Sequence, residues 1–173
     1  KYNFSNILEI GTHKGTCTIL LSKLFPKAKI TTIDLPDHFK VVHGKGADFI
    51  KQRNDLLASF PNIEFKQENS LDLISNDSKY DLIFVDGDHV SPVATADIVN
   101  SVRMINEGGF IICDDIYISE SNNYIKQWTV DSFSIINALS NAKLINYSLI
   151  LKRTIKPWAH PKLRKYIAIL TKK

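Results

Sequence analysis

Cysteine is scarce in this sequence, and long apolar runs are absent. The only two cysteines, Cys17 and Cys113, fall in stretches that predict a helix and a strand, so we expect buried side chains and not a disulfide. No stretch approaches the roughly 20 apolar residues that cross a bilayer, and no signal-peptide pattern opens the chain. Such cysteines fit a reducing compartment, and we expect a cytoplasmic protein.

Acidic residues are missing from the C-terminal end. From Lys152 to Lys173 there are eight lysines and arginines and no aspartate or glutamate, whereas the rest of the chain is slightly acidic. The formal net charge of +4 therefore says little about a nucleic-acid partner. With 44% hydrophobic and 23% charged residues, the composition is that of an ordinary globular domain.

The basic end also carries apolar residues at helical spacing. Leu163, Tyr166, Ile167 and Leu170 would share one face of a helix that begins after Pro161. We expect one domain over residues 1–153 and a basic amphipathic tail over residues 154–173 that packs on it. Binding of this helix to an anionic membrane, to nucleic acid or to a partner stays open, as does a homodimer.

Apolar runs and helix or strand breakers alternate along the chain. The predicted strands cover residues 6–10, 29–34, 63–67, 80–86 and 110–113, and the predicted helices cover residues 16–24, 46–60, 93–105 and 128–139. Two more strands are expected near residues 144–147 and 149–152. This order predicts an α/β fold: a Rossmann-like, doubly wound and mostly parallel seven-stranded sheet with helices on both faces.

The carboxyl ends of the predicted strands are polar. Residues at or just after such an end are Gly11, Asp34, Asn69, Asp86 and Asp114. Ligands of open α/β sheets bind beyond these ends, so we expect one binding site at this edge.

The loop from Gly11 to Gly15 joins the first predicted strand to the first helix. Its glycines allow a tight turn and let a ligand approach the main chain. A dinucleotide fingerprint needs a second glycine where His13 stands, and this side chain would crowd a pyrophosphate, so NAD is disfavoured. Asp34 still suits the hydroxyls of a ribose, because a carboxylate accepts from both at once.

Four blocks of the sequence stand in a distinctive order: E-I-G-T-H-K-G at residues 9–15, Asp34, V-D-G-D-H at residues 85–89, and G-G-F-I-I-C-D-D at residues 108–115. Together they resemble class I S-adenosylmethionine-dependent methyltransferases. Within that class the chain looks like the small O-methyltransferases with a D-G-D-H motif, relatives of the catechol type. The resemblance covers about residues 6–152 and implies S-adenosylmethionine (SAM) as cofactor. Relatives usually carry helices before the first strand that cover the substrate. Here the first predicted strand begins near Asn6, so we expect this covering segment to be short, absent or lost.

The resemblance implies a cofactor site. Gly11 and its neighbours would contact the methionine part of SAM, and Asp34 would hold the ribose. Asn69 stands where the family usually has an acid near the adenine amino group, and its amide oxygen can still accept a hydrogen bond there. The alternative is that Asn69 is only an ordinary turn residue after a strand. The expected cofactor residues are Glu9, Gly11, Thr12, Gly15, Asp34, Leu35, Asn69, Ser70 and Asp86.

Carboxylates gather after the fourth and fifth predicted strands, at Asp86, Asp88, Asp114 and Asp115. They repel one another unless a cation, protons or basic groups offset them, and hard oxygen ligands suit Mg²⁺ or another divalent cation. In the catechol-type relatives a metal is held at positions that match Asp86, Asp114 and Asp115, where it would lower the pKa of a substrate hydroxyl. The alternatives are that Asp86 serves only the cofactor and that Asp115 caps the next segment.

His89 is the expected general base. It lies three residues after Asp86, where the catechol-type relatives have a lysine, and a histidine with an ordinary pKa of about 6.5 accepts a hydroxyl proton at neutral pH. Asp88 is the next candidate, and the alternative for His89 is that it only orients its loop.

These features predict an enzyme that methylates a hydroxyl of a small molecule with SAM, with metal assistance left open. Methylation of nucleic acid or protein is an alternative, but the Asn/Asp-Pro-Pro-aromatic motif of amino-group methylation is absent, since residues 86–89 read D-G-D-H. A binding module of the same fold without turnover is a second alternative. The four carboxylates disfavour it, because such a module need not keep them.

Overall fold

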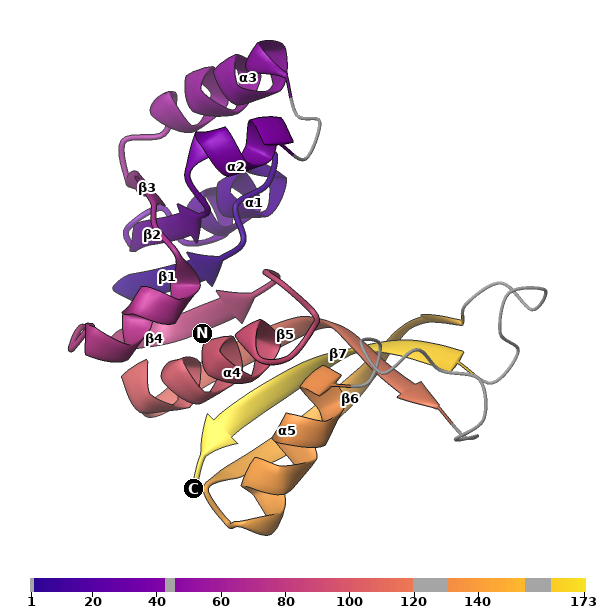
Figure 1. Cartoon of the computed structure of the whole chain (residues 1–173). Helices are drawn as coiled ribbons and strands as arrows, with labels where there is room; N and C mark the ends of the chain where they lie inside the picture. Colours follow the sequence, from indigo (N-terminus) through magenta and orange to yellow (C-terminus); the bar gives the residue numbers. More distant parts are fainter. Residues whose placement is uncertain (1, 43–45, 120–130, 155–162) are drawn as a thin grey trace.

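Seven strands form one sheet in the computed structural model, which describes residues 2–42, 46–119, 131–154 and 163–173 (Figure 1). The strand order is β3-β2-β1-β4-β5-β7-β6. The strands are β1 Asn6–Ile10, β2 Lys29–Asp34, β3 Ile63–Gln67, β4 Tyr80–Val85, β5 Ile105–Ser119, β6 Ile145–Thr154 and β7 Leu163–Lys172. The helices are α1 Thr16–Leu24, α2 Asp37–Val42, α3 Ala47–Ala58, the 3-10 helix η1 Ser70–Ser75, α4 Val93–Met104 and α5 Asp131–Asn141.

The first five strands run parallel, as the alternation of strands and helices predicts. The chain order reverses at β1, which has β2 on one side and β4 on the other. β7 runs antiparallel to both of its neighbours, β5 and β6, and is thus the one strand of this sheet that runs against the other six. The predicted seven-stranded, mostly parallel α/β sheet is therefore confirmed.

Both faces of the sheet are buried in its middle. Neighbouring residues of β1, Ile7 and Leu8, are both fully buried, but they belong to different apolar clusters because successive strand residues point to opposite faces. Helices α4 and α5 cover one face, where Ile98 and Ile136 join Leu8. Helix α1 covers the other face through Leu21, and α2 and α3 lie near β2 and β3 (Figure 1).

The C-terminal end forms a strand, so the helix expected after Pro161 is wrong for the described residues 163–172. Tyr166, Ala168 and Leu170 alternate along β7 and pack into the same core cluster. The backbone of β7 pairs with β5 on one side and β6 on the other, and these pairings outweigh the helical spacing of the apolar residues. The described part of the tail is thus an inner strand of the sheet.

Other boundaries also differ from the sequence prediction. The two late strands expected near residues 144–147 and 149–152 are one strand, β6, and β5 extends well beyond the expected residues 110–113 at both ends. The segment after β2 contains helix α2, which the sequence prediction did not include. Helix α5 begins at Asp131, and the expected residues 128–130 lie outside the described residues. Within the described ranges, none of the helices has the length and apolar character that a membrane span needs.

Two leucines on adjacent strands test the place of β7. Leu170 of β7 is fully buried, whereas Leu151 of β6 is 52% exposed. We expect Leu170→Ala to lower the free energy of unfolding by about 2–5 kcal/mol, because it leaves a cavity in the core, and Leu151→Ala to cost less than about 1 kcal/mol. Urea denaturation followed by circular dichroism measures both. Equal, small losses would contradict an inner strand at residues 163–172.

Candidate functional site

A cavity of about 520 Å³ opens at the carboxyl ends of β1 to β4. This is the edge where the sequence predicts a binding site, next to the point where the strand order reverses. Its walls come from the loops after the four strands and from the first residue of α4. The lining residues are Ile10, Gly11, His13, Ile33, Asp34, Leu35, Glu68, Asn69, Ser70, Leu71, Asp86, Gly87, Asp88 and Val93.

Gly11 lets the ends of β1 and β4 come close together. Its φ is +99°, and a Cβ at this position would lie 2.2 Å from the carbonyl oxygen of Asp86. The Asp86 N–H donates to the carbonyl of Ile10 at 2.8 Å, which fixes this approach. A side chain at position 11 would therefore push the two strand ends apart and disturb the cavity between them.

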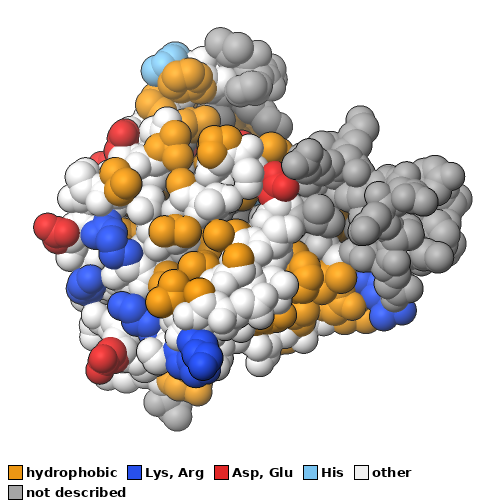
Figure 2. Space-filling model, turned by 60° about the horizontal axis from the view of Figure 1, so that its bottom comes forward, with side chains coloured by type: hydrophobic (Ala, Val, Ile, Leu, Met, Phe, Trp, Pro, Cys, Tyr) orange, Lys and Arg blue, Asp and Glu red, His pale blue; other side chains and the backbone are white. Residues whose placement is uncertain are grey.

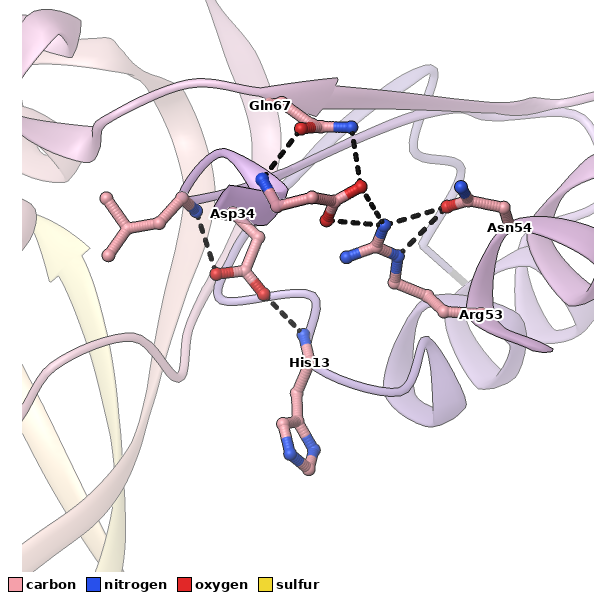
Figure 3. Close-up of polar contacts among 7 residues, drawn as sticks. His13, Asp34, Arg53, Asn54 and Gln67 are labelled. Atoms are coloured by element: carbon pink, nitrogen blue, oxygen red, sulfur yellow. Dashed lines mark hydrogen bonds and ion pairs between the residues drawn. The ribbon is translucent and has the colours of Figure 1, made fainter. Parts of the chain in front are cut away.

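Asp34 ties the glycine loop to the end of β2. Its carboxylate accepts the N–H of His13 and the N–H of Leu35, each at 2.8 Å (Figure 3). The side chain is almost fully buried, at 9% exposure of the residue, and it lines the cavity. The residue expected to hold a ribose thus also shapes the loop around it.

A buried arginine that the sequence prediction missed supports this corner. The Arg53 side chain is completely buried, and its Nη2 donates to Asp37 Oδ1 at 2.8 Å and to Asn54 Oδ1 at 2.8 Å (Figure 3). Its guanidinium lies 4.4 Å from the centre of the Phe65 ring. Gln67 in turn donates to Asp37 Oδ2 and accepts the Asp37 N–H. Arg53 therefore joins α3 to the start of α2 and to β3, and only the tertiary structure brings these partners together.

Three expected cofactor residues do not line the cavity. Glu9 is fully buried, and its carboxylate accepts from the hydroxyls of Thr18 and Thr32. Thr12 is buried too, with its hydroxyl oxygen 2.7 Å from that of Thr32. Burial raises the pKa of Glu9 despite these hydroxyl groups. Glu9 and Thr12 therefore connect the ends of β1 and β2 inside the protein, and Gly15 (φ +78°) is the N-cap residue of α1.

Asn69 serves the turn and also reaches the cavity. Its Oδ1 accepts the N–H of Leu71 at 3.0 Å, so it caps η1 as the turn alternative predicts. Asn69, Ser70 and Leu71 all line the cavity as well. Six of the nine expected cofactor residues share this wall: Gly11, Asp34, Leu35, Asn69, Ser70 and Asp86.

The three expected metal ligands come together beside the cavity. Asp86, Asp114 and Asp115 each offer an oxygen atom within 4.8 Å of the others. Between Cys113 and Ile116 the pairing of β5 with β7 shifts register, and Asp115 has a φ of 57°. Consecutive residues of a regular strand point to opposite faces, so this bulge is what lets both aspartates join the cluster.

The carboxylates of the cluster have shifted pKa values. Burial, together with the charges of Asp114 and Asp115, raises the pKa of Asp86 to about 6. Burial also acts to raise the pKa of Asp114, but the hydrogen bonds and charges of its partners, Lys152 first, hold it below its ordinary value. The cluster is therefore a place of strong charge interactions.

Two lysines that the sequence prediction missed contact the cluster. Lys165 of β7 pairs with Asp115 Oδ1, and Lys152 of β6 pairs with Asp114 Oδ2 and lies 3.8 Å from Asp115 Oδ1. The sequence prediction placed Lys152 at the end of a late strand and Lys165 in a helical tail, and neither position indicated a contact with the aspartates. The oxygen atoms suit a divalent cation in their chemistry, yet two of the three carboxylates already bind ammonium groups. The described residues thus do not present three free carboxylates to a metal.

His89 lies at the same cluster, whereas Asp88 does not join it. The Nε2 of His89 is 3.6 Å from Asp115 Oδ2, and its side chain is one-third exposed. Asp88 lines the cavity, and its Oδ1 accepts the N–H of Val90 at 3.0 Å. Of the two expected acid–base residues, His89 is therefore the one next to the carboxylates.

Comparison with known proteins gives a family match for most of the chain. A family model described as a methyltransferase domain matches residues 8–116. No curated protein sequence matches the chain. The matched residues run from β1 through most of β5, and therefore include the cavity and all three clustered aspartates.

Solved structures share the fold at low sequence identity. The O-methyltransferase from Bacillus cereus, in complex with S-adenosylhomocysteine (SAH), is 18% identical with a TM-score of 0.67, and the match covers 98% of this chain and 75% of that one. The O-methyltransferase TomG from Streptomyces achromogenes, in complex with SAM, is 16% identical with a TM-score of 0.66 over 99% and 74%. An rRNA methylase from Streptococcus thermophilus is 10% identical with a TM-score of 0.62 over 98% and 87%.

Two glycines at positive φ test the close approach of β1 and β4. Gly108 has a φ of +74°, a conformation that strains any residue with a side chain, as does the φ of +99° at Gly11. A Cβ at Gly108 would meet nothing within 4 Å, whereas a Cβ at Gly11 would clash. We expect Gly108→Ala to cost roughly 1–2 kcal/mol of unfolding free energy from backbone strain alone. Gly11→Ala adds a clash with the Asp86 carbonyl, and we expect a loss of about 3 kcal/mol or more. Equal losses in urea denaturation would contradict the tight contact at Gly11.

Proposed function

The chain belongs to the methyltransferase-domain family, and from this membership we propose that it transfers the methyl group of SAM to a hydroxyl of a small molecule. The observation that carries the proposal is the cavity at the ends of β1 to β4, which adjoins the acidic cluster. Asp86 belongs to both, so a cofactor in the cavity and an acceptor at the cluster would meet at this residue.

The size of the cavity and the chemistry of its walls support SAM as the ligand. Its volume of about 520 Å³ lies within the range of roughly 300–1,000 Å³ of small-molecule sites. All three of Gly11, Asp34 and Asn69 line the cavity. In the proposed complex Gly11 leaves the main chain open to the methionine part of SAM, Asp34 accepts hydrogen bonds from the ribose, and Asn69 lies beside the adenine. When bound, SAM supplies a methyl group on a positively charged sulfur, which leaves the protein to position the acceptor and remove its proton.

His89 is the residue we assign to proton removal. A neutral imidazole accepts a proton from a hydroxyl, and the carboxylate of Asp115, 3.6 Å from Nε2, would stabilise the imidazolium that results. Asp88 is less suited to this role, because its carboxylate already accepts a hydrogen bond within its own loop.

A hydroxyl acceptor is favoured over a nucleic acid by two observations. Two of the three structures named above are O-methyltransferases, whereas one is an rRNA methylase of lower identity. On the face drawn in Figure 2, lysines and arginines stand among acidic and hydrophobic side chains and form no continuous basic surface in the described part. Nucleic-acid binding depends mainly on such surfaces.

Calorimetric titration with SAH tests the cofactor site. We expect one site per chain, and we expect Asp34→Asn and Asn69→Ala each to weaken binding about tenfold or more, since each alters a polar partner of the adenosine. Asp72→Asn, at an exposed aspartate of η1, is the matched control and should leave the affinity unchanged. A folded wild-type protein that binds neither SAH nor SAM would contradict the proposal.

Methyl transfer from radiolabelled SAM then tests the acceptor class. A panel of phenols and sugars is compared with total RNA, and label in RNA alone would favour the nucleic-acid alternative. With an accepted hydroxyl compound, His89→Ala should lower kcat about 10²–10⁴-fold and leave the affinity for SAH unchanged.

A further inference from the structure

Two ammonium groups lie where three carboxylates need positive charge. The Lys165 side chain is only 6% exposed, and its Nζ pairs with Asp115 while lying 5.6 Å from the centre of the Tyr117 ring. Lys152 is 37% exposed and pairs with Asp114. A buried lysine is costly unless a carboxylate faces it, so Lys165 and Asp115 depend on each other.

Irregular pairing on both sides of β7 brings these groups together. The register of β5 against β7 shifts between Cys113 and Ile116, where the two aspartates lie. The register of β6 against β7 shifts between Leu151 and Arg153, so that Lys152 is the extra residue. Bulges of this kind re-aim side chains, and they are common next to active sites.

The ion pairs take up oxygen atoms that a metal would need. Lys165 and Lys152 both approach Asp115 Oδ1, and Lys152 holds Asp114 Oδ2. The other oxygen of Asp114 accepts the N–H of Asp115 at 2.7 Å. A divalent cation bound to Asp114 Oδ2 and Asp115 Oδ1 would have to displace both ammonium groups, and Lys165 would then be left buried without its partner.

We propose that Lys152 and Lys165 supply the positive charge of the acidic cluster, so that the acceptor site works without a divalent cation. The role in methyl transfer rests on the proposed function, whereas the charge balance is a property of the chain itself. Lys152, the more exposed of the two lysines, then places its ammonium group beside the acceptor, where a metal ion would otherwise supply the positive charge. A neutral hydroxyl compound can enter this site without bringing a metal.

Binding of Mn²⁺, followed by electron paramagnetic resonance of the free ion, tests this inference without any substrate. We expect no saturable site in the wild-type protein. The double variant Lys152→Met/Lys165→Met should gain one Mn²⁺ site per chain, because its three carboxylates lose their cations. Adding Asp115→Asn should abolish the gained site. Lys172→Met, at an exposed lysine of β7, is the matched control and should behave as wild type.

The outcomes decide the inference in either direction. Saturable Mn²⁺ binding by the wild type that Asp114→Asn removes would overturn it, and so would a folded double variant that binds no Mn²⁺. Circular dichroism checks the fold. If the double variant does not fold, the polar double variant Lys152→Gln/Lys165→Gln is measured in its place, with the same gain of one Mn²⁺ site expected, and the absence of that site contradicts the inference. SAH calorimetry on the same wild-type sample keeps the two claims separate, because loss of SAH binding contradicts only the proposed function.

Discussion

The pairing of β7 with both β5 and β6 is the constraint on which the acidic site depends. It places Lys165 in the interior of the sheet, where its ammonium faces Asp115. The register shifts on either side of β7 then bring Asp114 and Lys152 to the same point. Without the antiparallel insertion of this strand, the aspartates of β5 would face one another and Asp86 with no cation from the protein, and their repulsion would destabilise the sheet edge.

The cavity on the other side of Asp86 rests on a different set of contacts. The bare main chain of Gly11 allows β1 and β4 to meet, and the carboxylate of Asp34 holds the loop that follows Gly11. Behind Asp34, the buried guanidinium of Arg53 fixes the start of α2. The contacts of Asp34 and Arg53 are polar and partly buried, and together with the close packing at Gly11 they help to preform the cavity. A preformed site loses less conformational entropy on binding.

The sequence was sufficient to predict the parallel half of the sheet and the edge that carries the cavity. The parallel strands are short segments of apolar, β-branched or alternating residues, and the polar residues at or after the ends of β2, β3 and β4 place Asp34, Asn69 and Asp86 at one edge. The end of the chain was predicted wrongly because Leu163, Tyr166, Ile167 and Leu170 fit a helical face, whereas the alternation of Tyr166, Ala168 and Leu170 is what the sheet uses. Lys165 could not be assigned without that strand, since bulges and antiparallel insertion are set by tertiary pairing. Glu9 and Thr12 were expected to contact the cofactor. In the structure both are buried and bond to the hydroxyl of Thr32 on the neighbouring strand, a partner that only the tertiary structure reveals.

The central claim is that one edge of the sheet combines an adenosine-binding cavity with an acidic cluster balanced by lysines. A crystal structure of the protein with SAH, grown in the presence of Mn²⁺ and recorded with anomalous scattering, tests both halves at once. The account predicts SAH in the cavity, with its ribose at Asp34 and its sulfur toward Asp86, and no anomalous peak among Asp86, Asp114 and Asp115. SAH bound elsewhere, or a manganese peak at the three aspartates with Lys152 and Lys165 turned away, would contradict it.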